Sequence, residues 1–310
     1  MLHPKGLPIL LLFFNRKDTL TYVIEQIRKY KPSKLYLASD GSRASVQNET
    51  QIVGEIRQFV LDLIDWECEV KTLFRDENLG CKKAVHEAVQ WFFSQEEKGI
   101  VLEDDIVPSL NFFHFCEHAL ERFKDDKKVS SIGGRNELGC YEACDQDILF
   151  SSKFFCWGWA SWADRVLEND VEIGLNADVK KEVLLPLMVP ENRLVEGMFG
   201  LIESRQVNSW AYPYDICFRV KNQLQVLPAK NMIKNVGFSS AGAHSSGKGS
   251  DTVSCFDDFK PLIKTDAIPI KDERFIREYI SYRYKSFFKL FLFSKIKYLK
   301  PIRMLIKRMR

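Results

Sequence analysis

The first 105 residues alternate continuous apolar runs with amphipathic stretches, and this alternation limits the fold more than any other sequence feature. Residues 8–14 are an apolar run of the kind found in strands that are buried on both faces of a parallel sheet. We predict further strands at residues 34–39, 68–73 and 99–102, separated by helices at residues 19–31, about 48–64 and about 80–94. This order predicts an α/β fold, a parallel sheet with helices on both faces.

The pattern loosens after residue 150. We predict a helix at about residues 191–205, a helix or a strand at 214–221, and a loop rich in glycine and serine at 237–250. Residues 257–280 carry two prolines and are predicted to be a linker. The sequence shows no internal repeat.

The charge is unevenly distributed along the chain. The 45 Lys and Arg residues exceed the 42 Asp and Glu residues by three, but residues 281–310 contain ten of the cations and no acid. Removing those ten leaves 35 cations against 42 acids, a net charge of −7 over residues 1–280. An acidic body argues against DNA or RNA as a partner, and 45% apolar residues are enough for a sizeable core.

The eight cysteines include no C-x-x-C pair and are scattered along the chain, so we expect reduced thiols. The apolar run at residues 7–14 is too short for a signal peptide or a spanning helix, and no other run reaches about 18 residues. We therefore expect a protein that is kept in the cytosol.

Three of the predicted strands end in polar residues. They are followed by Asn15 and Arg16, by Asp40, and by the acids Glu103, Asp104 and Asp105. Ligands of parallel α/β sheets bind beyond the carboxyl ends of the strands, so we expect a binding site there. Three adjacent acids repel one another unless a cation offsets the repulsion, and carboxylate oxygens suit Mg²⁺ or Mn²⁺ bridging a diphosphate. A solvated acidic turn is the alternative.

Together these features resemble the nucleotide-diphospho-sugar glycosyltransferases of the GT-A fold, in particular the bacterial HlpA-like group. The resemblance covers about residues 7–245. It rests on the order and spacing of residues 8–16, 37–41, 73–83, 99–108, 157–162, 228–238 and 243–244. It implies a GT-A (Rossmann-like) mixed, mostly parallel sheet in residues 1–256, with a nucleotide-binding half at 1–150 and an acceptor half at 151–256.

The resemblance implies a donor that is a nucleotide-diphosphate sugar, such as a UDP-sugar, together with Mn²⁺ or Mg²⁺. Asp105 would bind the metal directly, while Glu103 and Asp104 would reach the ribose or a metal-bound water. His244 in the glycine-rich loop occupies the position from which the family reaches the metal or the diphosphate; an idle, exposed histidine is the alternative. This chain has serine after His244 where relatives have threonine.

The resemblance also places Asp40 against the base and Arg16 with Arg75 beside the nucleotide. Asp40 could instead belong to a simple turn, and Arg75 could form a surface ion pair. Further along the chain, Asn78, Lys82 and Lys83 flank the start of the third predicted helix. The N–H groups and ammonium groups at such a helix start could face a phosphate or be solvated.

Four tryptophans are candidates for binding sugar or acceptor. Trp157, Trp159 and Trp162 cluster around Gly158, where indole faces could stack on sugar rings and the glycine would allow close approach. Each tryptophan taken alone is more typical of a packed core than of a sugar-binding surface. Trp210 opens an aromatic segment that could hold an acceptor.

An inverting transfer needs a carboxylate that removes the proton of the acceptor hydroxyl. Asp215 follows the aromatic segment and is our choice, with Glu196 and Asp164 as alternatives. A retaining mechanism would not need this base.

Residues 281–310 interleave aromatic and aliphatic side chains with cations, a pattern typical of a helix lying in the plane of an anionic membrane. A calmodulin-type target and a packed C-terminal helix are the alternatives. The sequence thus predicts a metal-dependent glycosyltransferase, peripheral on the cytosolic face of the inner membrane, that extends a glycan or a lipid-linked acceptor in cell-surface polysaccharide or lipopolysaccharide synthesis. The alternatives are a nucleotidyltransferase that makes sugar nucleotides, and a non-catalytic nucleotide-binding protein docked on the membrane.

Overall fold

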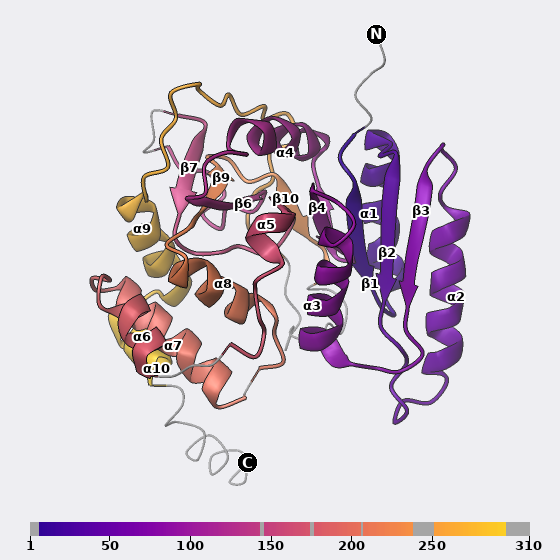
Figure 1. The fold of residues 1–310 in the computed structure, drawn as a ribbon, viewed down its shortest axis with the longest axis horizontal. Coiled ribbons are helices and arrows are strands. Elements are labelled where there is room, and N and C mark those ends of the chain that lie inside the picture. The colour runs from indigo at the N-terminus through magenta and orange to yellow at the C-terminus, as the bar shows by residue number, and fades with distance from the viewer. Residues whose placement is uncertain (1–5, 143–145, 174–176, 206, 238–250, 296–310) are drawn as a thin grey trace.

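A computed structural model describes residues 6–142, 146–173, 177–205, 207–237 and 251–295 of the chain. These residues form an eight-stranded sheet in the order β3-β2-β1-β4-β8-β6-β9-β7, and a two-stranded sheet that pairs β10 with β5 (Figure 1). The strands are β1 (Ile9–Phe13), β2 (Lys34–Ser39), β3 (Glu69–Phe74), β4 (Lys98–Glu103), β5 (Ile106–Pro108), β6 (Val129–Gly133), β7 (Ile148–Ser151), β8 (Trp159–Trp162), β9 (Leu224–Pro228) and β10 (Ile233–Asn235).

Helices cover both faces of the large sheet, and further helices gather at its β7 end, away from β3 (Figure 1). They are α1 (Lys17–Tyr30), α2 (Glu49–Asp62), α3 (Gly80–Phe93), α4 (Leu110–Arg122), α5 (Ala163–Val166), α6 (Ala177–Leu184), α7 (Glu191–Glu203), α8 (Ala211–Val220), α9 (Glu273–Tyr284) and α10 (Phe287–Ser294). The predicted α/β class, a mixed and mostly parallel sheet flanked by helices, is confirmed.

The first four strands of the predicted alternation form one parallel unit. β1 pairs in parallel with β2 on one side and β4 on the other, and β2 pairs in parallel with β3. Every residue of β1 is buried, as expected of a strand that is covered on both faces. Because parallel strands run in one direction, the residues that follow β1, β2 and β4 meet at the same edge of the sheet.

Alternate residues of β1 enter two different cores, because successive side chains of a strand point to opposite faces. Leu11 packs in the core that contains residues of α1, α2 and α4, whereas Leu10 and Leu12 pack in the core that contains residues of α3 and α8. Helix α3 therefore lies on one face of the sheet, directly beside the ends of β1, β2 and β4.

The second half of the sheet is mixed. β8 runs antiparallel between β4 and β6, β9 pairs in parallel with β6, and β7 pairs antiparallel with β9. The segment at residues 214–221, predicted as a helix or a strand, belongs to helix α8. The predicted helix at 191–205 is α7.

The prediction of a linker at residues 257–280 is wrong for its second part. Helix α9 begins at Glu273, and Phe275 and Ile276 on this helix are buried in a third core shared with α7 and α10. This apolar face makes α9 part of the folded body, and α10 packs on α7 (Figure 1). Within the described ranges, none of the helices has the length and apolar content to cross a membrane.

Candidate functional site

A pocket of about 430 Å³ opens at the carboxyl edge of the parallel strands. The residues that follow β1, β2 and β4 line it, together with the first two turns of α3. Three arginines, Arg16, Arg43 and Arg75, and the acids Asp40, Glu103 and Asp104 contribute to its wall. The sequence placed a binding site at this edge, and the structure brings the predicted polar residues of all three strand ends together there.

Arg16 lies between two acids of the triplet. Its Nη1 donates to Oδ2 of Asp105 at 2.7 Å, and its Nη2 donates to Oδ1 of Asp104. Asp104 is buried and also accepts the backbone N–H of Phe14 at 3.3 Å. Burial lowers the pKa of the Arg16 guanidinium, but the attraction of Asp104 and Asp105 outweighs burial and raises this pKa overall.

Glu103 has no such partner: within the described part of the chain its carboxyl group makes no hydrogen bond or ion pair. Burial, followed by repulsion from Asp105 and Asp104, raises the pKa of Glu103 to about 8. One guanidinium thus faces three carboxyl groups. Burial also raises the pKa of Asp104, to about 7, against the attraction of Arg16. The triplet can therefore hold its full negative charge only beside a further cation.

The triplet has the chemistry of a Mg²⁺ or Mn²⁺ site that is completed by phosphate. The described residues contain no group of three or more His, Cys, Asp or Glu side chains arranged to hold a metal by themselves. These cations commonly take only one or two protein carboxylates and fill the remaining positions with water and phosphate oxygens. The unpaired Glu103 and the half-buried Asp105 fit that role, whereas His244 lies outside the described residues.

Asp40 anchors the start of α3. Its carboxylate accepts the backbone N–H groups of Gly41 at 3.0 Å, Leu79 at 3.0 Å and Gly80 at 2.9 Å. Gly80 has a φ of +77°, which favours glycine, and a Cβ there would lie 2.8 Å from Asn208 Nδ2. Asp40 lines the pocket, as predicted, and in this structure its oxygens are bound to the backbone; contact with a base stays a prediction.

The other predicted donor-binding residues divide between the pocket and its surroundings. Arg75 lines the pocket and donates to Glu87 at 3.0 Å, and Asn78 lines it and donates to the carbonyl of Gly41 at 2.7 Å. Lys82 lines a neighbouring cavity instead. Lys83 is exposed beside Glu87 and lines neither.

The predicted sugar-stacking role does not fit three of the four tryptophans, because they are core residues. Trp159 is 0% exposed, packed among Phe93, Phe154 and Trp210 with ring centroids 5.4–6.2 Å away. Trp210 is also buried, and Trp162 is buried beneath Arg165.

Trp157 is the exception, because it is half-buried. The Arg135 guanidinium lies over its ring, 4.9 Å from the ring centroid. Gly158 adopts a φ of +66°, and a Cβ there would lie 2.5 Å from Ile233. Close packing within the protein therefore explains this glycine.

Asp215 does not fit the role of a catalytic base. Its side chain is fully buried and accepts hydrogen bonds from Lys153 Nζ at 2.7 Å, Arg219 Nε at 2.6 Å and the Phe154 N–H at 2.9 Å. Burial acts to raise the pKa of Asp215, but the two cations outweigh burial and lower it. A carboxylate with these partners is a weak base that no acceptor can reach.

The two alternative bases also lie away from the pocket. Trp162, at the end of β8, pairs with Lys98 at the start of β4, so Asp164 lies at the edge of the sheet opposite Glu103. Asp164 pairs there with Lys127 and Arg165. Glu196 on α7 pairs with Arg193 at 3.0 Å.

The sequence did not lead us to the residues that hold the pocket wall in place. Glu49, buried at the start of α2, accepts hydrogen bonds from Asn15 at 2.9 Å and from several groups of Arg43. Arg43 follows Asp40 closely in the same polar segment, which was an available signal. Asn208 joins the pocket wall from a loop far along the chain, and no sequence signal pointed to it.

Comparison with known proteins gives only distant likenesses. No protein-family model and no curated protein matches the chain. A crystal structure of HddC from Yersinia pseudotuberculosis is 11% identical with a TM-score of 0.31, over 52% of this chain and 79% of that one. UDP-glucose pyrophosphorylase complexed with UDP-glucose is 9% identical with a TM-score of 0.41, over 74% and 94%. Such values describe a loose likeness in α/β architecture, and the resemblance to the HlpA-like group stays a prediction.

Proposed function

We propose that the pocket at the carboxyl edge binds a nucleotide-diphosphate sugar and that the protein transfers the sugar to an acceptor. The observation that carries this proposal is the acid triplet at the end of β4, with Glu103 unpaired and one guanidinium for three carboxyl groups. Such a charge imbalance is stabilised when a divalent cation and its bound phosphates complete the site.

In this proposal the side chains of the pocket bind the donor and orient it. The nucleoside lies in the pocket beyond β1 and β2, where Asp40 holds the start of α3 in place. Arg43 and Arg75 line the same pocket and offer guanidinium groups to the diphosphate. Glu103 and Asp105 would hold Mg²⁺ or Mn²⁺, and a bound cation would offset the charge that builds on the leaving diphosphate. No base is assigned, since Asp215, Glu196 and Asp164 are engaged elsewhere.

Nucleotidyl transfer is the second candidate, because a pocket of this kind could also hold a nucleoside triphosphate. The connection between β1 and α1 counts against it. Only Phe14, Asn15 and Arg16 separate the strand from the helix, and none is glycine, so the loop has little backbone with which to wrap around a triphosphate. We therefore favour transfer of the sugar.

The test is a thermal-shift and calorimetric screen of UDP-, GDP-, CMP- and dTDP-sugars, with and without Mn²⁺. One donor is expected to raise the melting temperature in a metal-dependent way, and acceptor-dependent release of nucleoside diphosphate is expected from that donor. Release of pyrophosphate from a nucleoside triphosphate with a sugar 1-phosphate would instead establish nucleotidyl transfer. Metal-dependent binding with no turnover against a broad acceptor panel would establish a binding protein.

Asp105→Asn provides the site variant for this screen and Asp125→Asn, on an exposed turn, its matched control. The proposal is wrong if no nucleotide binds, or if Asp105→Asn binds donor and responds to Mn²⁺ as the unaltered protein does.

We propose in addition that the C-terminal segment associates with an anionic membrane surface. Helix α10 buries Leu290 against the body while Phe287 and Phe288 are 60% and 66% exposed. Lys285 and Lys289 flank these rings, and residues 296–310 add six cations and no acid to the sequence. Exposed phenylalanines beside cations suit a lipid surface, where the rings insert among the acyl chains and the cations contact anionic headgroups.

A further inference from the structure

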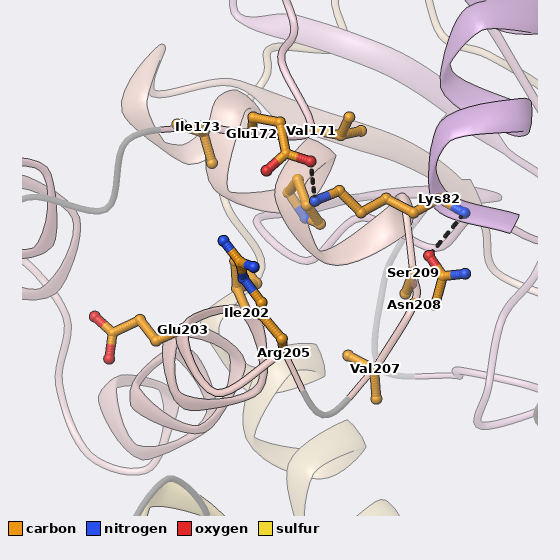
Figure 2. Close-up of a pocket in the computed structure, with 11 residues that line it drawn as sticks. Lys82, Val171, Glu172, Ile173, Ile202, Glu203, Arg205, Val207, Asn208 and Ser209 are labelled. Carbon is orange, nitrogen blue, oxygen red and sulfur yellow. Dashed lines mark hydrogen bonds and ion pairs between the residues drawn. The ribbon is translucent and has the colours of Figure 1, made fainter. Parts of the chain in front are cut away.

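A second cavity adjoins the pocket and has no role in donor binding as proposed. It encloses about 590 Å³ between the start of α3, the end of α7 and the segment that leads into α8 (Figure 2). Asn208 lines both spaces and accepts the backbone N–H of Lys82 at 3.2 Å. The two spaces therefore meet at the first turn of α3.

The walls of the cavity combine aliphatic side chains with polar and charged ones. Ile202 contributes from the end of α7, and the other apolar side chains come from the segments before α6 and α8 and from α8 itself. They are Val171, Ile173, Val207 and Pro213. These side chains offer apolar surface and no ring on which a sugar could stack.

The charged groups of the cavity are paired, with one exception. Lys82 Nζ pairs with Glu172 across the cavity, and Glu203 is directed away from that pair (Figure 2). Glu203 pairs with Lys180. The guanidinium of Arg205, an exposed residue, makes no hydrogen bond or ion pair within the described ranges of the chain. Figure 2 shows its side chain directed into the cavity, toward Ile173.

We propose that this cavity is the acceptor subsite, and that it takes the phosphate ester of the acceptor on Arg205 with the apolar part of the acceptor against the aliphatic walls. An unpaired guanidinium beside both aliphatic and polar side chains matches a phosphate joined to an apolar or saccharide group. The assignment rests on the proposed function, and Asn208, which lines both spaces, makes this cavity a neighbour of the donor pocket. In the transfer, an acceptor hydroxyl oxygen bonds to the anomeric carbon, the diphosphate leaves with the electron pair, and the hydroxyl proton passes to solvent.

The test measures binding by calorimetry with geranyl phosphate, galactose 6-phosphate and inorganic phosphate, and with geraniol and galactose as uncharged counterparts. Arg205→Gln is the variant, and Arg277→Gln, an exposed arginine on α9, is the matched control. At least one phosphate ester is expected to bind, and Arg205→Gln is expected to weaken that binding about tenfold while Arg277→Gln and UDP binding are unchanged. Tighter binding of geranyl phosphate indicates a lipid-linked acceptor, and tighter binding of the sugar phosphate a saccharide.

The subsite is wrong if Arg205→Gln binds the esters as well as the unaltered protein, if the uncharged compounds bind equally, or if inorganic phosphate matches both esters. These results leave metal-dependent donor binding untouched. Conversely, loss of donor binding with Arg205-dependent binding of an ester would overturn the proposed function alone.

Discussion

The carboxylate of Asp40 accepts the backbone N–H of Gly80 at 2.9 Å, forty residues further along the chain. The end of β2 is thereby joined to the start of α3, and both lie on the pocket wall. The first turn of a helix has N–H groups without intrahelical partners, and at the start of α3 this carboxylate accepts those of Leu79 and Gly80.

Replacing Asp40 with alanine is expected to lower the free energy of unfolding by about 1–2 kcal/mol, the usual cost of losing such a cap. Asp40→Asn keeps an acceptor oxygen and should lose less. Urea unfolding measures both, with Ser42→Ala, a neighbouring exposed hydroxyl, as the control. Equal stability of Asp40→Ala and the unaltered protein would show that the cap contributes nothing.

Removing the charge of Asp215 is expected to lower the free energy of unfolding. An effect on turnover alone is not expected. Asp215→Asn leaves Lys153 without its buried partner and Arg219 with Glu191 alone, a loss of about 3 kcal/mol at pH 7. Burial opposes the ionised form, but the cations outweigh it and hold the pKa of Asp215 below its usual value. The unfolded chain therefore binds the proton first, so this stabilisation is present above about pH 4 and is lost as the pH falls below it.

Unfolding experiments at pH 3 and pH 7 test this. The difference between the unaltered protein and Asp215→Asn should shrink at pH 3, whereas Asp126→Asn should differ little at either pH. A variant that is fully stable at pH 7 and loses only turnover would restore Asp215 as a base.

Arg16 and a divalent cation are expected to substitute for one another at the acid triplet. Arg16→Gln leaves the buried Asp104 without its cation and should lower the free energy of unfolding by about 3–5 kcal/mol. If the proposed metal site is correct, Mn²⁺ should restore part of that loss and EDTA should remove it again. The melting temperature with and without Mn²⁺ measures the effect.

Arg28→Gln is the matched control, because Arg28 forms a more exposed pair with Asp65; its melting temperature should not respond to Mn²⁺. An Arg16→Gln variant that is equally indifferent to Mn²⁺ and EDTA would argue against a cation at the triplet.

Phe288→Ser is expected to weaken binding to vesicles that contain anionic lipid, because it removes an exposed ring from the apolar face of α10. Vesicle sedimentation measures the bound fraction. Leu262→Ser is the control, since Leu262 is similarly exposed, at 68%, on a different segment. Equal binding by both variants, or binding that does not depend on anionic lipid or on the salt concentration, would exclude α10 as the membrane-binding surface.

The parallel unit and the position of the site could be read from the sequence, because their signals are local. The apolar run of β1 and the helical spacing of residues in α1 depend on neighbours within a few positions. The common position of the polar residues after β1, β2 and β4 could be predicted from the rule that the carboxyl ends of parallel strands lie at one edge of the sheet. Their convergence around Arg16 follows from that rule.

The roles of single residues beyond residue 150 could not be read in this way. Trp159 and Asp215 lie in sequence segments that suit a binding loop, yet the structure buries one among aromatic rings and the other between two cations. Whether a tryptophan face or a carboxylate is open to a ligand depends on partners that lie far along the chain.

The sequence by itself determined the alternating fold and the edge of the sheet where the acids gather, because hydrophobic period and strand direction are properties of short segments. The tertiary structure alone decided that Asp40 binds the start of α3, that Arg16 lies between Asp104 and Asp105, and that Asn208 lines two adjoining cavities. The physical reason is that charge pairing and exposure depend on distances between side chains, and packing brings together residues that lie far apart in the chain, such as Lys82 and Asn208 at 126 positions.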